Sequence, residues 1–363
     1  MMSRHGTLAL LAMTFFSVGG PGAGAADLTA KAQQPPPEAP FFRLVDNRVT
    51  FAWMPTGTTP AAFSTEPNGA INGTTAKQVY AFTHFDIWTY GTNFFLVSML
   101  KSDHNDPAGP CTNAGAIATP GAATKAASCA GAVENYAQFR STFGWNDIFG
   151  TKAFTVGPLH NISFEVGMDA TSSNSFLSSA RQAAVAGLQF QFDLPYNGYF
   201  NAAPLAYWEY RTHSAVNQCG SPFAGQVAGV NCLVDGNKGY DPTWAVETNY
   251  YMDLGFLPEA ARYFAISGRA AWIGPKGGQN NPLPSTSTAI EFNSEPIRLT
   301  FDASKAVWGP KYTHYVDLWL AYRYWQNKTG LDHAVSTACN VRPGVSNNTC
   351  TASTLYTGIT MKF

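Results

Sequence analysis

The side chains that could do chemistry alternate with apolar residues along short segments of the chain. Glu165, for example, lies between Phe164 and Val166. Successive side chains of a strand point to opposite faces, so this spacing collects acids, bases and aromatic rings on one face. Rings beside hydrogen-bonding groups suit a flat polar solute such as a nucleobase. The candidate solute-binding residues are Tyr80, Phe82, Glu165, Tyr207, Glu209, Arg211, Glu247, Tyr251, Arg269, Arg298, Asp317, Trp319, Arg323 and Trp325.

Two plainer interpretations apply to the same residues. The charged side chains could only pair with one another and rigidify an interior, and several aromatic rings could form a belt at a membrane interface. We assign five aromatic residues to such a belt: Trp53, Trp88, Tyr210, Trp272 and Phe363.

Catalytic and metal-binding motifs are missing from the sequence. It contains no G-x-S-x-G, no H-E-x-x-H and no phosphate-binding glycine loop, and its 7 histidines are scattered. His84 and Asp86 are two apart and could interact, but no partnering nucleophile can be identified. No C-x2-C pair or Cys/His cluster indicates a metal. We therefore expect a protein that is not an enzyme and has neither a cofactor nor a metal site.

Twelve segments have the alternation of a strand with one apolar and one polar face. Pro296 interrupts the tenth of them, and a proline cannot donate a hydrogen bond to a strand ladder. The expected strands are Leu44 to Trp53, Gln78 to Trp88, Asn93 to Ser102, Asn135 to Phe143, Asn161 to Asp169, Ala183 to Phe192, Ala203 to Arg211, Thr243 to Asp253, Arg262 to Trp272, Ile290 to Phe301, Thr313 to Gln326 and Thr354 to Phe363.

Composition favours a membrane barrel over a soluble domain. Only 12% of the 363 residues are charged, against about 25% in ordinary globular proteins, although 45% are hydrophobic. The last strand ends on the aromatic Phe363, as outer-membrane barrels often do, and it must pair with the first strand to remove both edges. The sequence thus predicts an all-β fold over residues 41–363: a transmembrane, antiparallel, up-and-down β-barrel of about 12 strands with both termini in the periplasm.

The first forty residues have the features of an exported chain. Arg4 and His5 precede an apolar run from Leu8 to Val18 and a small-residue stretch ending at Ala26. This pattern predicts a signal peptide over residues 1–26, followed by a proline-rich periplasmic leader over 27–40. The formal net charge of −1, without a basic stretch, argues against nucleic acid as a partner.

Six cysteines fall as three near-neighbour pairs: Cys111 with Cys129, Cys219 with Cys232, and Cys339 with Cys350. Six cysteines allow 15 connectivities, but each near pair lies within one segment rich in turn-forming residues, which favours local disulfides. The pairs follow the third, seventh and eleventh expected strands. Three disulfide-closed loops are therefore expected on the same, extracellular side of the barrel.

Three stretches resemble the Tsx-like family of nucleoside-specific channel-forming outer-membrane proteins. They are Gln78 to Leu100, Asn135 to Tyr210 and Tyr322-Arg323-Tyr324-Trp325. The resemblance implies a twelve-stranded barrel with a narrow lumen that binds nucleosides in passage, and its last motif carries Arg323 and Trp325 over as lumen residues. The longer, cysteine-bearing loops and the proline-rich leader depart from the family pattern.

The sequence therefore predicts a channel in the outer membrane of a Gram-negative bacterium for passive, selective uptake of nucleosides or similar small polar aromatic solutes. The alternative is a structural or surface-recognition barrel with a plugged lumen that acts through its loops. Expected partners are the solute, outer-membrane lipid and lipopolysaccharide, and phage or other surface ligands at the loops.

Overall fold

A single antiparallel sheet dominates the computed structural model, which describes residues 40–65, 68–103, 106, 108, 131–175, 179–213, 215–221, 223–276 and 289–363. Its twelve long strands are β1 (Phe42–Thr58), β4 (Thr74–Trp88), β5 (Gly91–Ser102), β6 (Val133–Gly144), β7 (Leu159–Ser173), β8 (Ala180–Leu194), β9 (Gly198–His213), β11 (Thr243–Asp253), β12 (Phe264–Ile273), β13 (Glu291–Asp302), β14 (Val316–Gln326) and β17 (Ala352–Lys362).

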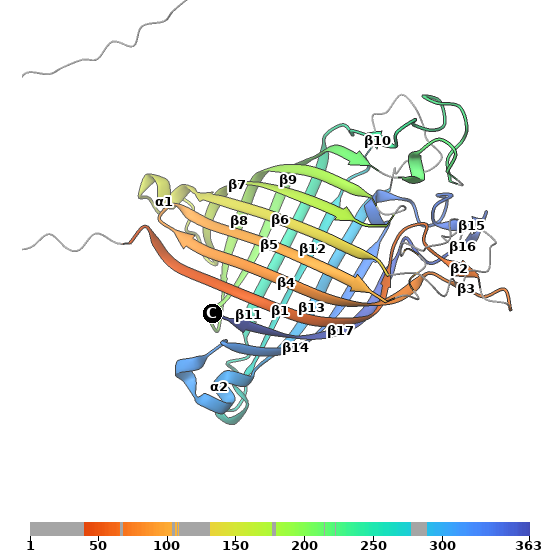
Figure 1. The fold of residues 1–363 in the computed structure, drawn as a ribbon. Helices are drawn as coiled ribbons and strands as arrows, with labels where there is room; N and C mark the ends of the chain where they lie inside the picture. Colours follow the sequence, from red (N-terminus) through yellow and green to blue (C-terminus); the bar gives the residue numbers. More distant parts are fainter. Residues whose placement is uncertain are drawn as a thin grey trace, which may run out of the picture. The chain divides into compact units, whose positions relative to one another are not determined.

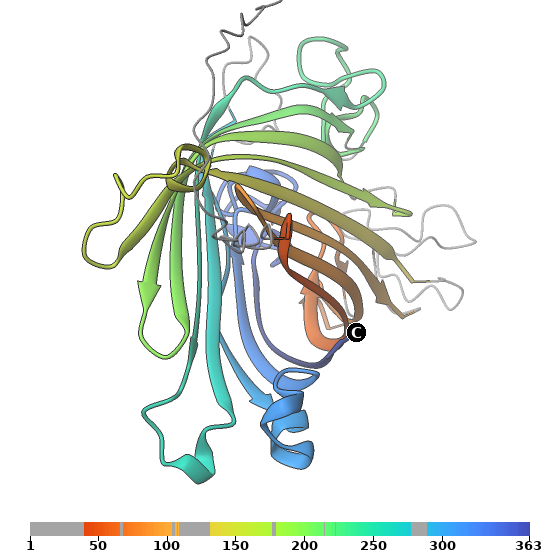
Figure 2. The same ribbon diagram turned by 90° about the vertical axis from the view of Figure 1, so that its left-hand side faces the viewer.

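Each long strand pairs with the next one along the chain, and the last pairs with the first. Arg48 lies opposite Lys362 and Trp53 opposite Thr357, so β17 joins β1 and closes the sheet into a barrel. Figure 1 shows β17 between β14 and β1, and Figure 2 shows the same strands turned by 90°. The predicted closed barrel of twelve antiparallel strands is confirmed.

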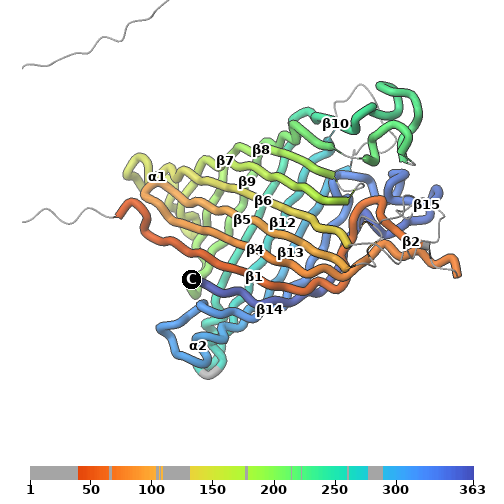
Figure 3. The backbone as a smooth tube through the Cα atoms, viewed as in Figure 1, coloured from red at the N-terminus to blue at the C-terminus, as the bar shows by residue number. Residues whose placement is uncertain are grey.

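The two ends of the barrel differ in what they carry. The start of β1 and the end of β17 lie at one end, with α1 (Trp145–Phe149) and α2 (Ala303–Trp308), and we call this the terminal end. At the opposite end, which we call the loop end, lie the short strands β2 (Ser64–Thr65), β3 (Ile71–Asn72), β10 (Asn237–Lys238), β15 (Asn340–Arg342) and β16 (Val345–Ser346). The tube in Figure 3 traces the same arrangement.

Helix α1 explains why the connection between β6 and β7 is longer than a tight turn. It begins directly after Gly144, and the chain leaves it at Gly150 in the left-handed conformation, with φ 59°. Among the described residues, no helix has the length and apolar composition needed to cross a membrane.

The disulfides at the loop end agree with two of the three predicted pairs. Cys219 is bonded to Cys232 and Cys339 to Cys350. Closing such short loops stabilises a fold by about 2–4 kcal/mol each. The predicted pair of Cys111 and Cys129 lies outside the described residues, as do residues 1–39 with the predicted signal peptide.

Loops from different strand connections pack together at the loop end. A buried cluster joins Ala61, Val216, Phe223 and Leu331 to both cysteines of the Cys339–Cys350 disulfide. Hydrogen bonds also connect the loops: the backbone N–H of Ala61 donates to Thr349 Oγ1 over 2.9 Å. The loops of the described residues therefore form a small core of their own.

Burial and register separate an outer from an inner face on every long strand. Phe51, Met168, Trp208, Leu320 and Leu355 are among the exposed outer residues. In the middle of the twelve described strands no charged side chain lies on this face; His84 with Asp86, and Lys101, lie toward strand ends. Charged residues in mid-strand positions all point inward, as the alternation predicts.

Glycine at position 358 lets β17 approach its neighbours on the inner face. A Cβ there would lie 2.5 Å from Trp319 Cζ2 and 2.6 Å from the carbonyl oxygen of Phe51. Both distances are shorter than van der Waals contact, so a side chain would push the ring or the β1 backbone away.

We expect Gly358→Val to lower the free energy of unfolding by about 1–3 kcal/mol, because overpacking next to backbone cannot relax cheaply. Urea unfolding of the refolded barrel, followed by tryptophan fluorescence, measures this change. The control is Leu355→Val on the outer face of the same strand, which removes one methylene from an exposed position. Equal stability of Gly358→Val and wild type would contradict the close approach.

Candidate functional site in the barrel interior

The interior contains a cavity of about 360 Å³ toward the loop end. Its walls come mainly from β1, β4, β5 and β6 on one side and from β12, β13, β14 and β17 on the other. Thr171 and Ser172 of β7, Arg181 of β8, and loop residues that include Thr59, Pro60 and Thr329 complete the lining. A cavity of this volume is within the size range of small-molecule sites. We call it the lumen pocket.

Aromatic and cationic side chains are stacked on one wall of the lumen pocket. The guanidinium of Arg298 lies 3.9 Å above the Trp319 ring, and Arg323 lies 5.0 Å from the centre of the Trp325 ring. Lys328 Nζ is 4.6 Å from the same Trp325 ring. Cations are attracted to the faces of aromatic rings. Arg298 covers Trp319 more closely than either cation approaches Trp325.

Glu295 is the carboxylate at the centre of this wall. It accepts a hydrogen bond from Arg298 Nε over 2.7 Å and another from the Tyr356 hydroxyl. Trp319 packs edge-on against Tyr356 and donates to Thr360 Oγ1 over 3.0 Å. These contacts use both oxygens of Glu295 within the protein.

The opposite side of the barrel interior is filled rather than open. Ala183, Val185, Leu205, Ala245 and Ile273 form a buried apolar cluster on the inner faces of β8, β9, β11 and β12. Small and branched side chains pack the interior of narrow barrels in this way.

Ion pairs cross the interior and separate this filled side from the lumen pocket. Arg140 on β6 reaches Glu247 on β11 over 2.6 Å and Asp169 on β7 over 2.9 Å. Nearer the loop end, Arg181 on β8 lies 3.3 Å from Glu291 on β13. Arg140 and Glu247 lie on strands that are not neighbours in the sheet, so these pairs act as struts across the barrel.

Lys276 completes the cluster at Glu291. Its Nζ lies 2.7 Å from Glu209 and 3.3 Å from Glu291, and all three side chains are almost completely buried. Removing one partner of such a pair leaves a buried charge without compensation, which costs about 3–5 kcal/mol. These residues therefore hold the filled side together.

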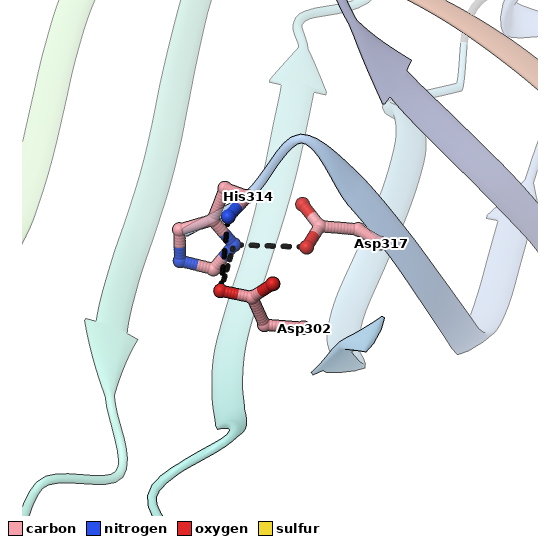
Figure 4. Close-up of side chains that lie close together, drawn as sticks. All are labelled: Asp302, His314 and Asp317. Carbon is pink, nitrogen blue, oxygen red and sulfur yellow. Dashed lines mark hydrogen bonds and ion pairs between the residues drawn. The ribbon is translucent and has the colours of Figure 1, made fainter. Parts of the chain in front are cut away.

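At the terminal end, His314 joins two carboxylates. Figure 4 shows its ring beside Asp302 and Asp317. The Nδ1 atom lies 2.9 Å from Asp317 and 3.8 Å from Asp302, and the Tyr251 hydroxyl lies 2.9 Å from Nε2. The ligand atoms of Asp302, His314 and Asp317 lie within 4.8 Å of one another, but both carboxylates already accept hydrogen bonds from the protein, so we assign no metal.

One lysine and one histidine outside the strands, Lys328 and His314, have shifted pKa values. Burial lowers the pKa of Lys328 well below its ordinary range. At His314 burial opposes the charged form, but the hydrogen bond and charge of Asp317, with the charge of Asp302, raise the pKa overall. The neighbouring carboxylates thus favour the charged form of His314, whereas burial disfavours the charged form of Lys328.

Most of the predicted site residues lie on the inner face. The lumen pocket brings together Arg269, Arg298, Trp319, Arg323 and Trp325. Glu165 and Glu247 belong to the Arg140 cluster, Tyr207 and Glu209 to the Arg181 and Lys276 cluster, and Tyr251 and Asp317 to the His314 cluster.

Three predicted lumen residues are elsewhere. Tyr80 is exposed on the outer face, and Phe82 lies beside Phe363 on the same face. The sequence-based assignment put this face of β4 inside because it also carries the polar residues His84 and Asp86. In the structure the other face is the inner one, because Val79, Ala81 and Thr83 line the lumen pocket. A register choice that is wrong by one residue exchanges the two faces of a strand.

Arg211 is displaced by a β-bulge. Gln182 pairs with Arg211, whereas Ala183 pairs with Glu209, so Tyr210 is an extra residue that breaks the alternation. Arg211 is exposed at the end of β9. A prediction based on strict alternation cannot detect such an extra residue.

Several interior residues were missing from the predicted set, among them Arg140 and Asp169 of the Arg140 cluster. Tyr356 shares the polar face of the last strand, so the alternation already indicated its position. Glu291, Glu295, Arg181, Lys276 and Lys328 lie at strand ends, in loops or beside the β13 bulge, where a period of two gives no signal.

No protein-family model and no curated protein shows significant similarity to the sequence. Solved structures match over most of their length but weakly. OccK1 (OpdK) of Pseudomonas aeruginosa is 8% identical, with 88% of this chain and 97% of that chain covered and a TM-score of 0.33. OprB of Pseudomonas putida is 10% identical, with 89% and 94% covered and a TM-score of 0.33. The outer membrane protein opdK of Pseudomonas aeruginosa is 6% identical, with 89% and 100% covered and a TM-score of 0.27.

The raised pKa of His314 predicts a pH-dependent stability. A group whose pKa is higher in the folded protein stabilises it below the ordinary value of 6.5, and this contribution is lost as pH rises through the folded pKa. We expect His314→Asn to be less stable than wild type at about pH 5.5 and to differ little at about pH 9. Asparagine tolerates the left-handed backbone at this position, where φ is 59°.

Urea unfolding at the two pH values measures the difference. Asp253, Asp302, Asp317, Tyr251 and Arg48 also face His314 and are identical in both proteins, so their titration largely cancels. A stability gap that is independent of pH would show that His314 acts through packing alone.

Proposed function

We propose that the barrel is a passive channel of a Gram-negative outer membrane that selects small polar aromatic solutes, with nucleosides as the first class to test. The observation that carries this proposal is the lumen pocket of about 360 Å³ inside a closed barrel. A cavity lined by hydroxyl, amide, aromatic and charged groups is what a channel with a solute site needs.

The outer face supports a membrane location. Mid-strand positions on it carry apolar or uncharged side chains, and several exposed tryptophans and tyrosines lie among them. Closure of the sheet leaves no strand edge that lipid would have to solvate. Export through the N-terminal signal peptide, contact with lipopolysaccharide, and phage or other ligands at the loops belong to the same proposal.

The choice of solute rests on two features. Trp325 is partly accessible in the lumen pocket, whose lining also includes Asn293 and Gln138. The amides of these two residues can pair with a nucleobase edge. The resemblance of three stretches to the Tsx-like channels points the same way. Trp319, by contrast, is only 4% exposed and covered by Arg298, so we assign it to the wall rather than to the solute.

A plugged barrel that acts through its loops is the second candidate. It is favoured by the ion pairs of Arg140 with Glu247 and of Arg181 with Glu291, which cross the barrel and narrow its interior. The two candidates differ in whether ions pass through the folded protein.

The membrane location predicts a large effect of charge on the outer face. Leu320 is 50% exposed in the middle of β14. We expect Leu320→Arg to lower the free energy of unfolding in lipid by about 2–4 kcal/mol, because an arginine in mid-membrane must lose its water. Reversible urea unfolding in phospholipid vesicles measures it. The matched control is Val335→Arg in the loop after β14, which we expect to change nothing measurable. An unchanged free energy of unfolding for Leu320→Arg would contradict the assignment of this face of β14 to lipid.

Planar-bilayer recording tests the channel. Refolded wild type should show a small conductance that adenosine and thymidine reduce and that glucose does not. Trp325→Ala should weaken the block by about tenfold, since stacking of a base on an aromatic ring contributes about 1–3 kcal/mol. Trp308→Ala is the control, because Trp308 is exposed on α2 at the terminal end.

Two results would count against this proposal. Absence of conductance from a barrel that migrates as folded on gels would favour the plugged alternative. Equal block of wild type and Trp325→Ala would remove Trp325 from the solute site.

A further inference from the structure

Positive charge exceeds negative charge in the lumen pocket. Its charged lining residues are two glutamates, Glu134 and Glu295, and five cationic side chains, Arg181, Arg269, Arg298, Arg323 and Lys328. The other described residues of the lining are uncharged. A cavity with low-dielectric walls concentrates the field of such an excess.

Both glutamates are neutralised by protein cations. Lys77 Nζ lies 2.5 Å from Glu134, and Arg298 Nε lies 2.7 Å from Glu295. Arg181 in turn is paired with Glu291. Lys328 Nζ donates to the backbone oxygen and to the hydroxyl of Thr58, over 2.6 and 2.9 Å, and burial lowers its pKa.

Arg269 and Arg323 remain without a carboxylate. Among the described residues, neither takes part in an ion pair within 4.0 Å, although Arg323 lies over the Trp325 ring. Arg269 is exposed to the interior. Arginine presents several N–H donors in a planar fork that matches carboxylate and phosphate oxygens.

Strand register places the two arginines at the same level of the wall. Arg269 on β12 lies opposite Glu295 on β13. On the other side of β13, Tyr324 pairs with Ser294 and Tyr322 with Ile297, so Arg323 falls opposite Glu295 and Pro296. The two arginines therefore flank Glu295, whose oxygens are already bound by Arg298 and Tyr356.

We propose that Arg269 and Arg323 bind the anionic group of the solute, so that the channel selects small organic anions carrying a carboxylate or phosphate over neutral molecules of the same shape. The inference rests on the proposed channel function and adds a charged group to the expected solute. A nucleoside monophosphate fits both the aromatic wall and the arginines.

Ion selectivity is the first test. With a salt gradient across the bilayer, the reversal potential of wild type should show preference for chloride over potassium. The double variant Arg269→Gln/Arg323→Gln should lose this preference, and Arg342→Gln should keep it. Arg342 is the matched control, because it is an exposed arginine on β15 outside the lumen pocket. Cation preference in wild type, or equal loss in the control, would overturn the proposal.

Solute binding is the second test and needs no conduction. Adenosine monophosphate and adenosine are titrated into the folded barrel in detergent, with tryptophan fluorescence as the readout, alongside 4-hydroxybenzoate and its neutral analogue 4-hydroxybenzyl alcohol. We expect each anion to bind about tenfold more tightly than its neutral partner, as charge-assisted hydrogen bonds predict. The double variant should remove that advantage.

The outcomes separate the two proposals. An advantage for the phosphate alone or the carboxylate alone identifies the oxyanion, and either supports the inference. Equal binding of anionic and neutral partners to wild type overturns it, even if the double variant does not fold. Anion binding without conductance would reject the channel while keeping the anion site.

Discussion

The pairing of β17 with β1 is the constraint on which the other features depend. A strand in lipid cannot leave its N–H and C=O groups unpaired, and the register from Arg48 with Lys362 to Trp53 with Thr357 satisfies both edges at once. Closure also defines an inside. The alternation of each strand then decides which side chains meet lipid and which share a narrow interior, so one backbone contact determines the environment of every long strand.

The interior is organised by the need to compensate buried charge. Arg140 with Glu247, and Arg181 with Glu291 and Lys276, connect strands that are far apart around the barrel. A buried ion pair contributes little net stability, but losing one partner is costly. Such pairs consequently specify one arrangement of the walls. One of them borders the lumen pocket directly, because Arg181 is among the residues that line it.

The sequence predicts the barrel well because the evidence for it is repeated on every strand. All twelve expected strands exist, including the one interrupted at Pro296, where the structure has a bulge between Ser294 and Ile297 in the pairing with β14. The sequence predicts less reliably which face of an individual strand points inward. On β4 both faces carry bulky or polar residues, so Tyr80 and Phe82 were assigned inward, and at Arg211 a bulge shifts the pattern by one residue.

The site was predictable only in part, because its specificity depends on which charges are paired. The alternation predicts an inward side chain for Arg269, Arg298 and Arg323 alike. It does not predict that Glu295 binds Arg298 and Tyr356 rather than its other neighbours. Glu291 and Lys276 lie beyond regular alternation, yet they neutralise Arg181 and Glu209. Long-range partners of this kind arise from the closed cross-section.

Pairing also separates two kinds of interior charge. The charges of the filled side are buried and compensated, as a dry interior requires. Arg269 is exposed to the lumen instead, so water can solvate its guanidinium when no solute is bound. A hydrated, uncompensated cation adds little strain to the fold and still attracts anions. At the terminal end, the ion pairs of the described residues join four carboxylates, Asp46, Asp253, Asp302 and Asp317, to Arg48, Lys362 and His314. This acidic excess would weaken the binding of an anion there. A site that binds at one end and not at the other can release its solute, which passage through a channel requires.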